Sequence, residues 1–461
     1  MRKFMKQAAA LLLALTFIIP QMGCSSNGQN QNYTGSGTTF LSFSNKADVC
    51  VHLNGHNITS NTRALYTGTG VTNIMGTGII AGTPYSETTY GAALHHNSKG
   101  GTINLYSGTY RQASGSEDHA FTLNMHGAGG TLNIYDDAIV EGSVSGQAIR
   151  VGYASSAGIA VNVMGATVNG KVYMVGAKTP DTYTTALTLD GAKVNGTVNI
   201  DGTNNFTVAH DTQIALLDME DTTKLTMDRL TDGANIVVSK PGEFTNINDK
   251  AADYAKYFKA VWLNDLIVAQ GNILQYKINY TADLLLDAQN KARCPACQKI
   301  VTWIELNDDS KEHVFTDGGH FYLTEDLTYS GESTFLTTGE KDTLTCLHLN
   351  GNDITTTNAY AIFISSGALN VMGEGTVAGK TTNTARGTVL YSNNKNGQNY
   401  ANLYSGTYTK YDSSASVPVI TIGSNGGNIT IHEDALIDAP GTGMAIHAGT
   451  ATTSNSTLSI L

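Results

Sequence analysis

The feature that most constrains this chain is a long internal duplication. The string Asn104–Tyr110 (NLYSGTY) recurs unchanged at Asn402–Tyr408, and CVHLNG at Cys50 recurs as CLHLNG at Cys346. These and three further matched blocks lie 296 to 298 residues apart. An offset this constant indicates two tandem copies of one unit. Leu461 falls inside a predicted strand, so we expect the second copy to be incomplete and the sequence to be a piece of a longer protein.

A shorter repeat inside each copy predicts the fold. An alternating apolar–polar–apolar strand motif, followed by Gly or Asp, recurs in the first copy at intervals of 21 to 31 residues. No helix-length periodic segment separates its occurrences. Strands at this spacing, without crossover helices, predict a solenoid of stacked coils. The inward-facing motif positions are Leu53, Ile74, Leu105, Ile134, Val163 and Leu189.

The residues at the start of each copy resemble a known family. The string Leu53–Thr59 (LNGHNIT), with its counterpart Leu349–Thr355, resembles the first coil of right-handed parallel β-helix proteins of the pectate-lyase-like superfamily. The wider layout is similar to repetitive surface lipoproteins of gut anaerobic bacteria, in which a CxxC segment and a strand like Gly319–Leu323 (GHFYL) precede each LNG element. The resemblance implies an all-β, right-handed parallel β-helix solenoid. It does not imply one chemistry, because the superfamily contains lyases, hydrolases, adhesins and inert scaffolds.

These patterns divide the chain into six parts. Residues 243–290 interrupt the strand motif, and Tyr254, Tyr257 and Phe258 have helical spacing, so we expect a small α/β cap or linker with a short helix there. The predicted parts are a lipoprotein signal peptide (1–23), a flexible tether (24–37), the first β-helix (38–242), the cap (243–290), a CxxC segment with an entry strand (291–330), and a truncated second β-helix (331–461).

The N-terminus has the features of an export signal. A short basic segment precedes an apolar stretch of 12 residues, Ala8 to Ile19, which is short for a bilayer span. Gly23-Cys24 follows and resembles the lipobox of bacterial lipoproteins, which implies lipid on Cys24. An ordinary cleaved signal is the alternative. We therefore expect an exported protein in the cell envelope, anchored to a membrane through lipid and exposed at the surface.

The outward residues of the strand motif form a candidate glycan-binding stripe. One predicted file begins at His52 and continues as Asn residues, and the file beside it contains Tyr. Amides suit sugar hydroxyls, and aromatic rings cover the apolar side of a pyranose. A purely structural Asn ladder between stacked strands is the alternative. The candidate stripe residues are Asn104, Tyr106, Asn133, Tyr135, Asn402 and Tyr404.

A second candidate site is a metal centre. Cys294 and Cys297 form a CxxC motif, and His313 and His320 follow after gaps of 15 and 6 residues. These are the ligand types of a structural zinc site, although the last gap is longer than usual. In an exported protein, a disulfide between the two thiols is the alternative. We expect Cys50 and Cys346, which occupy matched positions, to be buried core thiols.

Charge and motif content narrow the function. The formal net charge of -11 argues against nucleic acid as a partner. Carboxylate pairs at Asp136-Asp137 and Glu433-Asp434 lie where a strand turns, and no complete catalytic motif accompanies them. We expect a non-catalytic protein that binds an extracellular polysaccharide or host surface glycan, or acts as an adhesin. A polysaccharide lyase or glycoside hydrolase is the first alternative, and a structural stalk is the second.

The lipid anchor is directly testable. Metabolic labelling with a clickable fatty acid should mark the wild-type chain and leave Cys24→Ala unlabelled, because the thiol is the acylated atom in such proteins. Equal labelling of both chains, or of neither, would contradict lipidation at Cys24.

Overall fold

The chain folds into two units, unit 1 (Met1–Lys277) and unit 2 (Ile278–Leu461). Cys24, the predicted signal peptide and most of the predicted tether lie outside the part that is described. The computed structural model describes residues 33–35, 39–43, 48–83, 91–113, 121–142, 146–152, 158–175, 185–202, 205–220, 225–245, 251–340, 342–380, 387–393, 399–411, 417–441, 443–448 and 456–461.

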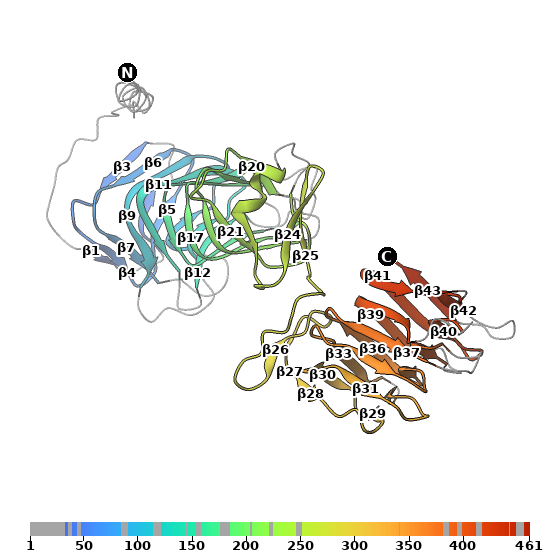
Figure 1. Cartoon of the computed structure of the whole chain (residues 1–461). Coiled ribbons are helices and arrows are strands. Elements are labelled where there is room, and N and C mark those ends of the chain that lie inside the picture. The colour runs from blue at the N-terminus through green and yellow to red at the C-terminus, as the bar shows by residue number, and fades with distance from the viewer. Residues whose placement is uncertain are drawn as a thin grey trace, which may run out of the picture. The chain divides into compact units, whose positions relative to one another are not determined.

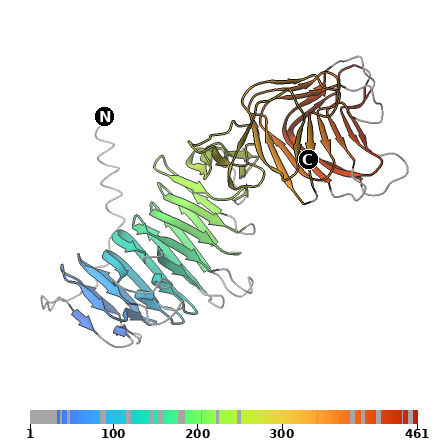
Figure 2. The same ribbon diagram turned by 90° about the horizontal axis from the view of Figure 1, so that it is seen from below.

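The expected all-β architecture is confirmed. Both units are parallel β-solenoids, with about 13 turns in total and almost no helix. Strand pairing runs in parallel from each coil to the next, and Figure 2 shows the strands of unit 1 side by side in successive rows. Each coil contributes strands to three faces, which we call A, B and C.

In unit 1, faces A and B share two long strands that bend from one face to the other. These are β9 (Thr102–Gln112) and β11 (Gly130–Glu141). The other strands of face A are β3 (Val49–His52), β6 (Val71–Met75), β13 (Ile159–Met164), β16 (Thr185–Asp190), β18 (Asn205–Ala209) and β20 (Leu225–Asp228). Face B continues through β1 (Tyr33–Gly35), β4 (Ile58–Ser60), β7 (Ile79–Gly82), β14 (Thr167–Asn169), β17 (Lys193–Ile200), β19 (Gln213–Met219) and β21 (Asn235–Val238).

Face C completes the coils of unit 1 (Figure 1). Because β1 already pairs with β4, strand pairing begins within the segment expected to be a tether. The far end of face C extends beyond residue 242 to a strand that pairs with β21. The strands of face C are β2 (Thr39–Phe43), β5 (Arg63–Thr67), β8 (Gly91–His96), β10 (Phe121–Met125), β12 (Gln147–Val151), β15 (Lys171–Met174), the second halves of β17 and β19, the end of β21, and β23 (Phe258–Ala260).

The last segment of unit 1 forms a small α/β cap, as the break in the strand motif predicts. It contains helix α2 (Ala251–Tyr254) and the 3-10 turn η1 (Ala255–Tyr257). An antiparallel sheet accompanies them, formed by β22 (Gly242–Glu243), β24 (Leu266–Gln270) and β25 (Ile273–Lys277). Among the described residues, no helix is both long enough and apolar enough to cross a membrane.

Unit 2 repeats the three faces. An antiparallel ribbon of β26 (Lys291–Arg293) and β27 (Ile300–Thr302) precedes them. Face A consists of β28 (Ile304–Leu306), β30 (Gly319–Leu323), β33 (Leu344–His348), β36 (Gly367–Met372), β39 (Asn399–Lys410), β41 (Gly427–Asp438) and β43 (Ser456–Ile460). Face B consists of β31 (Leu327–Tyr329), β34 (Ile354–Thr356), β37 (Thr376–Gly379) and the second halves of β39 and β41. Face C consists of β29 (His313–Phe315), β32 (Leu336–Thr338), β35 (Ile362–Ile364), β38 (Leu390–Ser392), β40 (Ile420–Ile422) and β42 (Ile446–Ala448).

The alternating pattern places one apolar side chain of each strand above the equivalent one in the previous coil. On face A of unit 1, the register stacks Ile74, Leu105, Ile134, Val163 and Leu189, and all five are fully buried. Each such side chain contributes about 1.5–3 kcal/mol through burial. The core of each solenoid is therefore a set of parallel apolar columns.

The two identical NLYSGTY strings adopt the same local structure. Gly108 and Gly406 have positive φ angles of 94° and 90°, at the bend between faces A and B. The buried Tyr110 hydroxyl donates to the carbonyl oxygen of Ser107 over 3.1 Å, and Tyr408 makes the same bond to Ser405 over 3.0 Å. The matched sequences of the two copies therefore have matched local structures.

Close coil packing predicts one stability effect. A methyl group added at Gly82 would overlap the carbonyl oxygen of Ala92, and the matched Gly379 meets the same obstacle at Thr388. Gly82→Ala should destabilise unit 1 by about 1–3 kcal/mol, measured by urea denaturation. The control Thr59→Ala, at an exposed position of β4, should change stability by less than about 0.5 kcal/mol. Equal midpoints for the two variants would contradict this packing argument.

Candidate functional site

The Asn residues of face A form a continuous hydrogen-bond ladder. In unit 1, Asn162 donates to Asn133 over 2.9 Å, Asn133 to Asn104 over 2.8 Å, and Asn104 to Asn73 over 2.8 Å. Asn73 donates to Cys50 Sγ over 3.7 Å. Asn104 and Asn73 are buried, and Asn133 and Asn162 are half-buried. The amides therefore bond to one another between neighbouring coils, as expected for a structural Asn ladder, which is the alternative to a glycan-binding stripe.

The ladder of unit 2 has the same order. Asn402 donates to Asn370 over 2.8 Å, and Asn370 donates to Cys346 Sγ over 3.6 Å. The strand register pairs Cys50 with Asn73, and His52 with Met75. The expected alignment of His52 with the Asn file was thus wrong by two residues, and a cysteine stands at that position in both units.

The Tyr file beside the ladder is stacked as well. The rings of Tyr106 and Tyr135 lie 4.7 Å apart at 12° in unit 1. In unit 2, Tyr404 stacks on His432, the counterpart of Tyr135, with centroids 4.2 Å apart. Tyr404 carries a further ring, because Tyr280 stacks on it at 4.2 Å and 15°. Among the described residues, Tyr135 is the only aromatic ring stacked on Tyr106.

A segment of the chain itself covers face A in unit 2. This cover segment, residues 278–303, packs Leu284, Leu286, Ala292 and Trp303 over Cys346 and Met372. It is also held by hydrogen bonds. Gly373 N–H and Ser405 Oγ donate to the Tyr280 carbonyl over 2.7 and 2.8 Å, and Leu284 N–H donates to Asn350 Oδ1 over 3.1 Å.

The cover segment gives matched residues opposite environments in the two units. Cys346 and His348 are fully buried, whereas their counterparts Cys50 and His52 in unit 1 are exposed. Burial lowers the pKa of His348 to about 4, so this side chain is neutral at pH 7. The expectation of a buried thiol was correct for Cys346 and wrong for Cys50, which lies exposed on β3 and is disulfide-bonded.

The CxxC motif and one of the two predicted histidines form a compact group. Potential ligand atoms of Cys294, Cys297 and His320 lie within 4.8 Å of one another, and Cys297 Sγ lies 3.5 Å from His320 Nε2. His313 does not join this group. His313 lies on β29 of face C, and its Nε2 is 2.6 Å from the Asp308 carbonyl oxygen.

The thiol of Cys346 is a direct neighbour of this group. A hydrogen bond with Cys346, followed by burial, raises the pKa of Cys294 to about 12, while His320 and the Cys297 backbone N–H act in the opposite direction. A hydrogen bond with Cys294 raises the pKa of His320, with burial opposing it and Cys297 adding to it. All three cysteines carry unbridged thiols.

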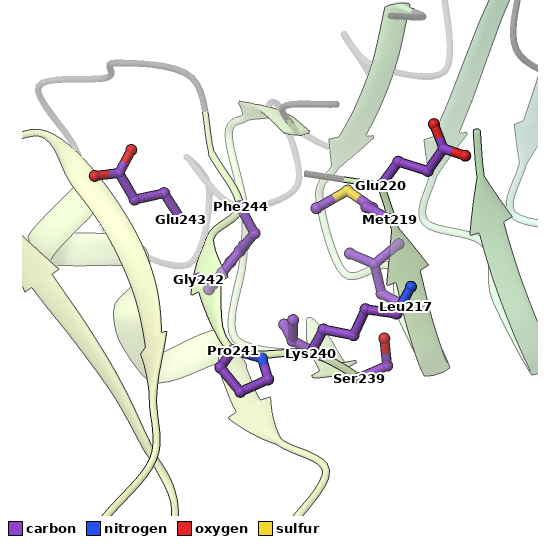
Figure 3. A pocket seen from close by; sticks show the side chains of 10 residues that line it. Leu217, Met219, Glu220, Ser239, Lys240, Pro241, Gly242, Glu243 and Phe244 are labelled. Carbon is purple, nitrogen blue, oxygen red and sulfur yellow. The ribbon is translucent and has the colours of Figure 1, made fainter. Parts of the chain in front are cut away.

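The acidic pairs lie apart from any described hollow. Asp136 and Asp137 are exposed at a register shift in β11, and Glu433 and Asp434 are exposed at the matched shift in β41. A small pocket lies at the end of unit 1, between Leu217, Met219, Pro241 and Phe244. Figure 3 shows the carboxylates of Glu220 and Glu243 at its rim, pointing away from one another. This arrangement does not resemble a pair of catalytic carboxylates.

Buried histidines of unit 1 support the coils. His96 on β8 contacts Thr67 Oγ1 over 3.0 Å and the Gly129 carbonyl oxygen over 3.1 Å. Burial, aided by the nearby Arg63, lowers the pKa of His95 to about 3. Both side chains sit among polar neighbours in adjacent coils, as structural histidines do.

Sequence reasoning missed Tyr280 and the role of Cys346. Tyr280 lies before the blocks that match between the two copies, so the repeat comparison could not assign it a position. Cys346 was interpreted through its match to Cys50. The one available signal was that only the second of these cysteines follows a CxxC motif.

Comparison with known proteins adds no relative. The chain matches no protein-family model, no curated protein and no solved structure.

The ladder predicts a stability effect at its centre. Asn104→Ala would leave the Asn73 oxygen and the Asn133 amide without their ladder partner, so unit 1 should lose about 2 kcal/mol or more. Asn195 is a matched control, because it makes an exposed Asn–Asn bond to Asn169. Hydrogen–deuterium exchange of face A peptides measures both variants. Similar protection in Asn104→Ala and Asn195→Ala would show that the ladder contributes little.

Proposed function

We propose that this is an exported, non-catalytic surface protein that binds a glycan chain along face A of unit 1. One observation carries the proposal. The cover segment occupies face A in unit 2, while the exposed His52 and the half-buried Tyr106 on face A of unit 1 have no such segment over them among the described residues. Unit 2 thus supplies an example of what this type of surface accommodates: an extended segment that presents a ring and an oxygen.

The ring position is defined by Tyr280. In unit 2, two rings stack on Tyr404, namely those of Tyr280 and His432. In unit 1, the counterpart of Tyr404 is Tyr106, and among the described rings only Tyr135 stacks on it. A pyranose is a flat ring with an apolar C–H side, and aromatic faces bind such rings. The remaining face of Tyr106 is therefore the proposed sugar platform.

The oxygen position is defined by the same comparison. In unit 2, the Tyr280 carbonyl accepts from Gly373 N–H and Ser405 Oγ. In unit 1, the matched Gly76 N–H donates directly to Ser107 Oγ over 2.7 Å. A sugar hydroxyl could insert between these two groups, accepting from Gly76 and bonding to Ser107, as the Tyr280 carbonyl does in unit 2.

A polysaccharide suits the length of the surface. The half-buried Asn133 and Asn162 lie beside the Tyr file, and each amide has a second hydrogen beyond its ladder bond. An exported protein with lipid on Cys24 would meet extracellular glycans as abundant polymers. The resemblance to pectate-lyase-like proteins and to repetitive surface lipoproteins supports the same setting. Several weak contacts along one chain would add as avidity.

The platform residue gives the sharpest test. Tyr106→Ala should lower affinity about fivefold, corresponding to about 1 kcal/mol for one lost aromatic contact. The matched control Tyr404→Ala should leave affinity unchanged, because Tyr280 already occupies that ring face. The full chain is first screened against soluble neutral, acidic and mucin-type polysaccharides, and affinities are then measured by biolayer interferometry.

Three outcomes would contradict the proposal. Unchanged binding in Tyr106→Ala would remove the platform. Absence of binding to all tested polysaccharides would favour the structural stalk. Release of oligosaccharides that is lost in Asp137→Asn would favour the lyase or glycoside hydrolase.

A further inference from the structure

We propose that unit 2 contains a structural zinc site formed by Cys294, Cys297, His320 and Cys346, and that it fastens the cover segment to face A. The inference does not depend on glycan binding, which concerns unit 1. It differs from the ligand set that sequence spacing suggested, because Cys346 replaces His313.

The CxxC motif sits in a hairpin that presents both sulfur atoms on one side. Strands β26 and β27 pair antiparallel, and the turn between them holds the motif. Cys294 N–H donates to the Lys299 carbonyl over 2.8 Å, and Gln298 N–H donates to the Cys294 carbonyl over 2.9 Å. Gln298 has a positive φ of 62°, which closes the turn. The two thiols are thus preorganised before any metal binds.

The other two ligands come from the solenoid. His320 on β30 and Cys346 on β33 are register partners, so they lie on the same face in neighbouring coils. The fully buried Cys346 neighbours Cys294, and His320 neighbours Cys297. Tetrahedral zinc requires about 3.5–4 Å between ligand atoms. Cys294, Cys297 and His320 already form a group within 4.8 Å, and the Cys346 thiol, which neighbours Cys294, has to turn toward that group to complete the four ligands.

The surroundings of the group suit a closed metal site. The Asn370 amide at the end of the ladder donates to Cys346 Sγ over 3.6 Å. The edge of Trp303 contacts the His320 ring at 5.3 Å, and Trp303 Nε1 donates to the Ala292 carbonyl. Cys294 and Trp303 are almost completely buried. Such packing fixes the ligands and leaves no open coordination position, which is characteristic of structural rather than catalytic zinc.

Zinc binding would join parts of the chain that are otherwise held only by packing and a few hydrogen bonds. The three thiols would each lose a proton to solvent, and neutral His320 would bind through a ring nitrogen. The metal would then link the cover segment to two coils of the solenoid. Tyr280 belongs to the same segment, so the bound zinc would also help to hold the Tyr280 ring on Tyr404.

Zinc content and ligand substitution test the site in the full chain. The protein is purified without metal-affinity resin, reduced, and supplied with zinc alone. Mass spectrometry should find about one zinc per chain, and Cys346→Ser should weaken zinc binding at least about tenfold against a chelator. His313→Ala should bind as the wild type does. In the cobalt-loaded chain, thiolate-to-metal absorption should fall by about a third in Cys346→Ser, because one of three thiolates is lost.

Limited proteolysis tests whether zinc fastens the cover segment to face A. Chelation should expose Lys291 and Arg293 in the hairpin to trypsin, and added zinc should restore protection. Cys297→Ser, at a half-buried position, provides a second ligand variant if Cys346→Ser fails to fold by circular dichroism. Less than about 0.2 zinc per reconstituted chain, normal zinc affinity in Cys346→Ser, or loss of zinc in His313→Ala would each overturn the proposal. A Cys294–Cys297 disulfide in protein isolated from the cell envelope would do the same.

Discussion

Parallel pairing between coils is the constraint on which the rest of this structure depends. Each side chain on a strand lies above the equivalent side chain one coil earlier, at the spacing of neighbouring strands. A position is therefore suitable only for residue types that pack well against their own kind. Inward positions use Ile, Leu and Val, and outward positions use Asn, which bonds to Asn, or Tyr, which stacks on Tyr. Like charges would repel in such a file, which fits the low charged fraction of 14%.

Most of the fold could be predicted from the sequence because this constraint leaves a periodic trace. The inward column from Ile74 to Leu189 and the Asn file were both readable from the strand motif. The alignment of the first coil was wrong because it matched Leu53, which lies in the LNG turn after the strand, to Ile74 of the next coil. Asn54 and Gly55 in that turn have positive φ angles, and Val51 rather than Leu53 pairs with Ile74.

The candidate sites were less predictable, since they depend on a segment outside the repeat. The ligand set Cys294, Cys297, His313 and His320 followed from sequence spacing alone. Spacing could not show that His313 belongs to face C, or that register places Cys346 beside His320. Tyr280 carried no periodic signal at all. What the repeat does offer is an internal comparison, in which the same strand sequence has a cover segment over it in unit 2 and none in the described part of unit 1.

The position of the cover segment has a consequence for longer chains. The segment lies before the solenoid that it seals, so it travels with the copy that follows it. A chain that grew by duplicating this whole block would seal each added solenoid with its own leader. Gene duplication would then lengthen the protein by solenoids whose face A is already occupied by a segment of the same chain.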